Sequence, residues 1–346
     1  MPVRTIAGTD IAYYLIAFDE HGAERRETDG TLLSETVMSK VGVASDVFLI
    51  SHGWQGDLPA AIEQYDRWVD AMARQTFDLE AIRLRRGRFA PLIIGWHWPS
   101  RLWGDETLPA SGGGSLLSAR GDVDAMVEDC AKQIADTSKA RAAIRTVLSA
   151  ATSMEPVTLT PALNDAYATI FAESGLSNAG VQGAPGTDQD GFDPQAIIAD
   201  ARAARGTGVP GLLGSDDDLR SVFLMPLRQL SFWKMKDRAR LFGETGAHRM
   251  LSSLQQAAPS ARFHLMGHSF GCIVVSASVA AQPPLLRPVD SLFLVQGALS
   301  LWSYSPDIPY AAGIPGYFNQ IIKRKLVSGP ILTTRSIHDT AVRQFY

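Results

Sequence analysis

The stretch RFHLMGHSFGCIVVS at residues 262–276 places an apolar run directly before Gly-His-Ser-Phe-Gly and a run of small and apolar residues directly after it. The first run predicts a buried strand, and the second predicts a helix over residues 270–281. Gly267 and Gly271 keep the space beside Ser269 clear, so the strand and the helix can approach closely. A serine on such a turn stands above the carboxyl edge of a sheet, at a helix N-terminus that favours negative charge. The stretch therefore predicts that Ser269 is a nucleophile.

Similar short apolar runs recur along the chain and predict a sheet. Runs that are nearly continuous, rather than alternating, are typical of parallel strands covered on both faces. Helical spacing over residues 58–76 and 233–258 separates the runs, and Gly243 and Gly246 favour a break in the second helix. The alternation predicts an α/β fold with a doubly wound, mostly parallel sheet. Its strands are expected at the N-terminus and at residues 46–54, 91–100, 262–269, 291–300 and 329–336.

The alternation stops between residues 101 and 230. This segment contains SGGGS, NAGVQGAPGTDQDGFD and RGTGVPGLLGSDDD, which are loop compositions. We therefore expect a core of residues 1–100 and 231–346, with residues 101–230 as a large helical insertion where a lid would lie. An irregular surface excursion without a gating role is the alternative. Helical patches within the insertion are expected at about 120–150, 161–174 and 194–204.

Composition favours a globular protein and excludes several kinds of partner. Of the 346 residues, 46% are apolar and 20% are charged, as in ordinary globular domains. The formal net charge is −4 and no basic patch with interleaved aromatic residues occurs, so nucleic acid is not an expected partner. Cys130 and Cys272 match no metal or redox spacing, so we expect both to be buried apolar residues. No H-E-x-x-H, EF-hand or P-loop pattern occurs, so we expect neither a metal nor a cofactor.

The N-terminal segment MPVRTIAGTDIAYYLIAFDEHG lacks the basic region and long apolar core of a signal peptide. No apolar run approaches the ~20 residues of a membrane span, so no integral membrane segment is expected. We expect a cytoplasmic protein, with export without a cleaved signal as the alternative.

Two motifs resemble those of the α/β-hydrolase superfamily, and the resemblance extends over residues 46–100 and 231–339. GHSFG resembles the nucleophile elbow of that superfamily, and LISHGW, which follows an early strand, resembles its oxyanion motif. The resemblance implies an α/β-hydrolase fold. It also implies that the backbone N–H of Phe270 is one oxyanion donor and that the second comes from the loop at Gly53 and Trp54.

The segment GWHWPSRLWGD at residues 95–105 follows a predicted strand, so it lies at the same edge of the sheet as the serine. We expect Trp96 and Trp98, together with His52, at a substrate pocket. Aromatic packing beneath the insertion is the alternative for the tryptophans. His52 and His268 belong to the two motifs as residues that shape the turns, and we expect neither to be the general base.

The resemblance also implies where the remaining triad residues lie, because the chain order in this superfamily is Ser, then Asp or Glu, then His. Asp339 follows the second predicted strand after the serine and is the expected acid, with helix capping as its structural alternative. Of the seven histidines only His338 follows Ser269. Three hypotheses stay open: the given chain is truncated and its base is absent or supplied by another chain; His338 is the base; or the pocket binds without catalysis.

The sequence as a whole predicts a serine hydrolase that forms an acyl-enzyme, most simply with a carboxylic ester. The choice of ester, of the esterase or lipase kind, is an analogy with the resemblance. The expected partners are a small ester or lipid-like substrate and, if the chain is truncated, a C-terminal piece or a second copy. A catalytically silent binding module is the alternative function.

Overall fold

The computed structural model of the chain describes residues 3–54, 58–100, 123–152, 158–177, 184–185, 191–205, 222–309 and 311–336. The chain forms two compact units, which divide after Ser100 and again after Asp237. The first unit contains Ser269, and the second contains the predicted insertion, residues 101–230, together with residues 231–237 and the C-terminal residues 338–346.

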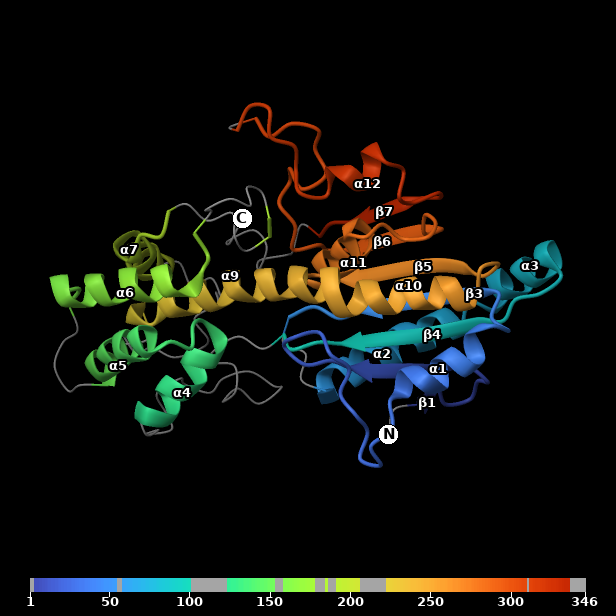
Figure 1. Cartoon of the computed structure of the whole chain (residues 1–346), viewed down its shortest axis with the longest axis horizontal. Coiled ribbons are helices and arrows are strands. Elements are labelled where there is room, and N and C mark those ends of the chain that lie inside the picture. Colours follow the sequence, from blue (N-terminus) through green and yellow to red (C-terminus); the bar gives the residue numbers. More distant parts are fainter. Residues whose placement is uncertain are drawn as a thin grey trace. The chain divides into compact units, whose positions relative to one another are not determined.

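A seven-stranded, mostly parallel sheet forms the centre of the first unit (Figure 1). The strands follow the order β1-β2-β4-β3-β5-β6-β7 across the sheet, and in the described sheet only β1 runs antiparallel, against β2. The predicted parallel strands are confirmed, and the N-terminal segment forms two strands instead of one. The bounds are β1 (Val3–Thr5), β2 (Ala12–Ala17), β3 (Asp46–Ser51), β4 (Pro91–His97), β5 (Arg262–His268), β6 (Ser291–Val295) and β7 (Ile331–Thr334).

The central strands are almost wholly apolar because both of their faces are covered. In β4, residues 92–96 are all buried, which is why this strand shows no alternation in the sequence. Strands β3 and β5 are neighbours, and Ser51 pairs with Gly267 at their carboxyl ends. This register brings the segment that follows β3 beside the turn that follows β5.

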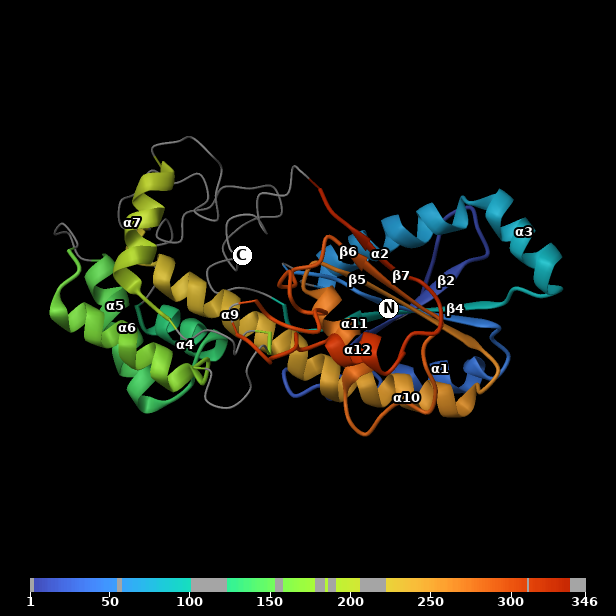
Figure 2. The same ribbon diagram turned by 90° about the horizontal axis from the view of Figure 1, so that it is seen from above.

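Helices cover the sheet on both sides (Figure 2). On one side lies α2 (Leu58–Ala73), which buries Ala61, Tyr65 and Val69 at helical spacing, and α3 (Thr76–Arg86) follows it. On the other side lie α1 (Leu33–Val41), α10 (His248–Ala257) and α11 (Gly271–Ala280). The short helix α12 (Asn319–Lys323) precedes β7. The described part of the first unit is therefore a doubly wound α/β structure.

One long helical segment precedes β5 and contains a π-helical turn in its middle. It consists of α9 (Met225–Phe242), the π-helical turn η1 (Gly243–Ala247) and α10. The predicted break at Gly243 and Gly246 does not occur. A Cβ on Gly243 would lie 2.5 Å from the Cβ of Ala277 in α11, and one on Gly246 would lie 2.5 Å from the carbonyl oxygen of Gly22. The glycines thus permit close backbone approach instead of ending the helix.

The described part of the second unit is helical. Its helices include α4 (Val123–Gln133), α5 (Ser138–Thr152), α6 (Pro161–Ser174) and α7 (Pro194–Arg205). The helical patches predicted from the sequence are confirmed, although the first of them forms two helices. Helix α6 begins where the hydroxyl of Thr160 accepts the N–H of Leu163, and it ends at Gly175 in the left-handed conformation. A lid function for this unit stays a prediction.

The two cysteines are free and buried, as predicted. Among the helices of the described residues, none combines the length and the apolar character that crossing a bilayer requires.

Candidate active site

Ser269 lies at the point of the sheet where the order of the strands reverses direction. Strand β3 continues through α2 to β4 on one side of it, whereas β5 continues through α11 to β6 on the other side. In open α/β sheets the crevice outside the carboxyl ends of two such strands is the usual ligand site. Ser269 directly follows β5, so it lies at the carboxyl edge where such a ligand site is expected.

The backbone of Ser269 is held in a conformation that serine rarely adopts. Its φ is +53°, in the left-handed region that costs a non-glycine residue about 1–2 kcal/mol. Three hydrogen bonds hold the turn: the N–H of Ser269 donates to Val295 O at 3.0 Å, and Ser269 O accepts from the N–H groups of Cys272 and Ala298, both at 3.1 Å. The end of β6 therefore holds the strained turn in place. Such strain persists where surrounding structure fixes it, and it is frequent at active sites.

Three glycines allow the segments around Ser269 to touch. A Cβ on Gly267 would lie 2.3 Å from the carbonyl oxygen of Gly271, and a Cβ on Gly271 would lie 2.2 Å from that of Ser51. A Cβ on Gly53 would lie 2.7 Å from the Cβ of Ser269. The predicted reason for glycine at positions 267 and 271, space beside the serine, agrees with these distances. The loop at Gly53 and the serine turn are in contact, as the predicted oxyanion arrangement requires.

A buried tyrosine that the sequence analysis did not single out fixes this loop. The hydroxyl of Tyr65, on α2, accepts the N–H of His52 at 2.8 Å and donates to Trp96 O at 2.6 Å. Burial holds the pKa of Tyr65 well above its ordinary value, so the hydroxyl stays protonated. Gly95 makes room for the ring, because a Cβ there would lie 2.8 Å from it. Helical spacing places Tyr65 in the core, but only the structure shows its hydrogen bonds.

His52 is a neutral, fully engaged residue in this structure. Its Nδ1–H donates to Gly53 O at 2.8 Å, which leaves Nε2 as an acceptor for the N–H of Trp98 at 3.3 Å and for Nδ1–H of His97 at 3.0 Å. Burial, followed by the charge of His97, lowers the pKa of His52 to about 3. His52 therefore stays uncharged at neutral pH and shapes the loop.

Trp96 and Trp98 lie in the interior, each with 0% of its surface exposed. The indole N–H of Trp96 donates to Met250 Sδ of α10 at 3.2 Å. The indole N–H of Trp98 donates to His52 O at 3.2 Å, and its ring stacks on both His52 and Phe242. Trp98 therefore supports the loop beside Ser269 from behind, while Trp96 points toward α10.

The described residues contain no partner for the serine hydroxyl. Within them, no hydrogen bond to Ser269 Oγ occurs, and the adjacent His268 accepts one from Gln64 Nε2 at 3.2 Å. The predicted acid Asp339 and the candidate base His338 lie outside the described residues. The structure thus brings together Ser269, Phe270 and Gly53, and it leaves the positions of the acid and base undetermined.

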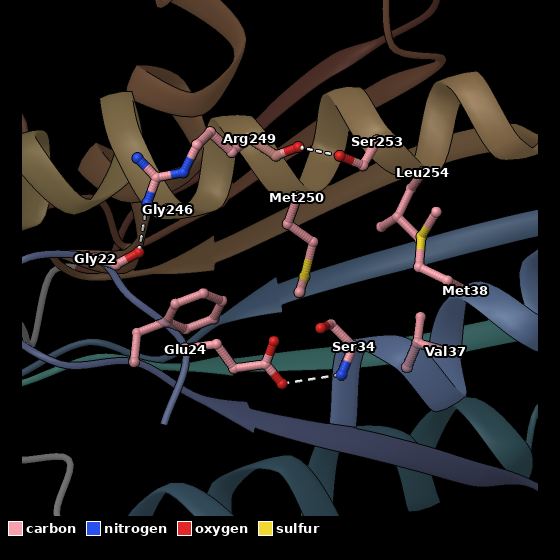
Figure 3. Close-up of a pocket in the computed structure, with 11 residues that line it drawn as sticks. Gly22, Glu24, Ser34, Val37, Met38, Gly246, Arg249, Met250, Ser253 and Leu254 are labelled. Atoms are coloured by element: carbon pink, nitrogen blue, oxygen red, sulfur yellow. Dashed lines mark hydrogen bonds between the residues drawn. The ribbon is translucent and has the colours of Figure 1, made fainter. Parts of the chain in front are cut away.

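A cavity of about 300 Å³ lies between α1, the loop after β2 and α10, away from Ser269 (Figure 3). Its two charged residues have structural partners. Arg249 donates to Gly22 O at 2.8 Å, and Glu24 accepts the N–H of Ser34 at the start of α1, at 2.9 Å. These bonds fasten the loop after β2 to the helices, and we assign no binding role to this cavity.

In the stretches that the structure describes, no three His, Cys, Asp or Glu side chains gather as metal ligands would. Comparisons of the chain with protein-family models, with curated proteins and with solved structures find no match. The geometry around Ser269 is therefore the basis for assigning a function.

The strain at Ser269 gives a prediction with a definite sign. Replacing Ser269 by Gly relieves the positive φ, so Ser269→Gly should exceed Ser269→Ala in free energy of unfolding by about 1 kcal/mol. The matched control is Ser253, in the interior of α10, where Gly should be less stable than Ala by about 1 kcal/mol. Urea denaturation of the four variants measures both differences. The same sign at both positions would contradict the strained turn.

The Tyr65 hydroxyl can be removed while its ring is kept. Tyr65→Phe leaves the N–H of His52 and the carbonyl of Trp96 buried without this partner, so it should lower the free energy of unfolding by about 1–3 kcal/mol. Tyr14→Phe, at another buried tyrosine, is the control and should change stability by less than about 0.5 kcal/mol. Equal stability losses in the two variants would contradict the stabilising role of the hydrogen bonds made by the Tyr65 hydroxyl.

Proposed function

We propose that this protein is a serine hydrolase of α/β-hydrolase fold that cleaves carboxylic esters through an acyl-enzyme. The observation that supports this most strongly is the positive φ of Ser269 on a tight turn from β5 into α11. A strained strand-to-helix turn that lifts a serine above the sheet is the nucleophile elbow of that fold. The carboxyl ends of β3 and β5, where the strand order reverses, are the expected ligand position.

In this proposal Ser269 Oγ attacks the carbonyl carbon of the ester and its proton passes to a histidine. The N–H of Phe270 and an N–H from the loop at Gly53 and Trp54 stabilise the oxyanion of the tetrahedral intermediate. The contact between Gly53 and Ser269 supports this assignment, because it keeps the loop within reach of the reacting carbon. Loss of one oxyanion donor typically lowers turnover by about 10²–10³. The alcohol then leaves, and water hydrolyses the acyl-enzyme.

The general base is proposed from the sequence and not from geometry. In this proposal Asp339 orients a histidine that is either His338 or outside this chain. His52 is unsuited to the role, because its pKa is about 3 and both of its ring nitrogens are engaged. The second unit is proposed to act as a cap. His52 and Trp98 are proposed to form one wall of the substrate pocket, and Trp96 lies deeper in the interior.

A catalytically silent binding module is the second candidate. The observation that favours it is that His52, the histidine of the loop in contact with Ser269, has both ring nitrogens engaged and a lowered pKa, so it offers the serine no general base. Without a base, a serine stays a protonated and weak nucleophile. The crevice would then hold a ligand without reacting with it.

Labelling with a short-chain fluorophosphonate separates the two functions. We expect one adduct on Ser269 of the wild-type chain, found by intact mass and peptide mapping, and none at this position in Ser269→Ala. Hydrolysis of a small aryl ester should fall in the same variant by about 10⁴ or more. A folded wild-type chain that gains no adduct on Ser269 would favour the silent module.

A further inference from the structure

A second cavity, of about 470 Å³, lies on the face of the sheet that α2 covers. Its volume falls within the range of small-molecule sites, which are mainly apolar and hold a few polar groups. Of the residues described around it, only His264 and Ser291 are polar. The others are apolar and come from β3, α2, β5, β6 and β7, among them Phe48, Trp68, Met72, Leu265 and Phe293.

These two polar residues belong to a hydrogen-bonded chain that ends on a buried carboxylate. Ser291 Oγ lies 2.8 Å from His264 Nδ1, and His264 Nε2 lies 3.2 Å from Asp46 Oδ1. Asp46 is 1% exposed, and Arg86 and Ser45 also donate to its carboxylate. The chain forms because β3, β5 and β6 are neighbours in the sheet, with His264 and Ser291 in register.

The carboxylate of Asp46 determines which atoms hold the protons. An ionised carboxylate only accepts hydrogen bonds, so His264 carries its proton on Nε2 and donates it to Asp46. His264 Nδ1 is then an acceptor, and the hydroxyl of Ser291 donates to it. Phe48, stacked on the imidazole at 4.9 Å, holds the ring in this orientation. A serine that donates to a histidine, which a carboxylate in turn orients, has the arrangement of an activated nucleophile.

Ser291 also borders space that a reactant can enter. Ser291 and His264 both line the cavity, and 21% of the His264 side chain is exposed. The site is separate from Ser269: His264 and Ser269 are five residues apart in sequence, and a strand that rises ~3.3 Å per residue places them about 17 Å apart.

We propose that Ser291 is a second nucleophile, which accepts the acyl group of an activated ester of an apolar acid. The acyl chain occupies the apolar cavity. Ser291 Oγ forms a bond to the carbonyl carbon while its proton moves to His264 Nδ1. The bond between that carbon and the leaving-group oxygen then breaks, and the leaving group takes the proton from His264.

The test uses a fluorophosphonate with a long alkyl chain, applied to the wild-type chain and to Ser269→Ala. Chymotrypsin cleaves between the two serines, so mass spectrometry of the digest assigns each adduct. We expect an adduct on Ser291 in both proteins, formed at the same rate, and faster than with a methyl-chain probe. No adduct on Ser291 in the folded wild-type chain overturns the proposal, whatever happens at Ser269.

Two variants test the role of the histidine. His264→Gln keeps a polar side chain but cannot take the proton, so labelling of Ser291 should fall about 10²-fold. Labelling of Ser269 in the same variant should be unchanged, which also shows that the protein remains folded. Ser291→Ala should lose the adduct altogether. Unchanged labelling of Ser291 in folded His264→Gln overturns the proposal, and if that variant does not fold, the result with the wild-type chain and Ser269→Ala still decides it.

Discussion

The close contact between the first turn of α11 and the end of β3 is the constraint on which the candidate active site depends. The carbonyl oxygen of Ser51 would lie 2.2 Å from a Cβ on Gly271, so this helix can start against this strand only with glycine there. Because α11 starts so close to the sheet, the chain has little room to turn from β5 into it. The turn is accordingly tight, and Ser269 takes a positive φ. The same closeness brings Gly53 against the serine.

The contact is held from several directions. Tyr65 ties the segment after β3 to the end of β4, and Trp98 donates to and stacks on His52 from behind. The N–H of Ser269 is bonded to the end of β6. Four neighbouring strands and α2 therefore fix a turn that is strained by itself. This redundancy is what a site needs if a nucleophile and its oxyanion donors are to keep their places during a reaction.

The sequence predicts the parts of this structure that rest on local pattern. Apolar runs predict the parallel strands, and the glycines on either side of Ser269 predict the turn, because both are local patterns in the sequence. Features that depend on contacts between residues far apart in the chain are not predicted by the sequence. Gly246 of η1 packs against Gly22, more than two hundred residues earlier, and the hydrogen bonds of Tyr65 depend on the register of β3 and β4. The chain from Asp46 through His264 to Ser291 likewise exists only after three strands have paired.

The proposed chemistry requires a covalent intermediate on Ser269. Rapid-quench mass spectrometry of the wild-type chain mixed with p-nitrophenyl butyrate would detect it. We predict a transient butyryl adduct on the peptide that contains Ser269, which forms together with a burst of p-nitrophenol and decays at the rate of steady turnover. If p-nitrophenol is released at the same rate by Ser269→Ala, or if no adduct forms on Ser269 at any time, the strained turn is not a catalytic one.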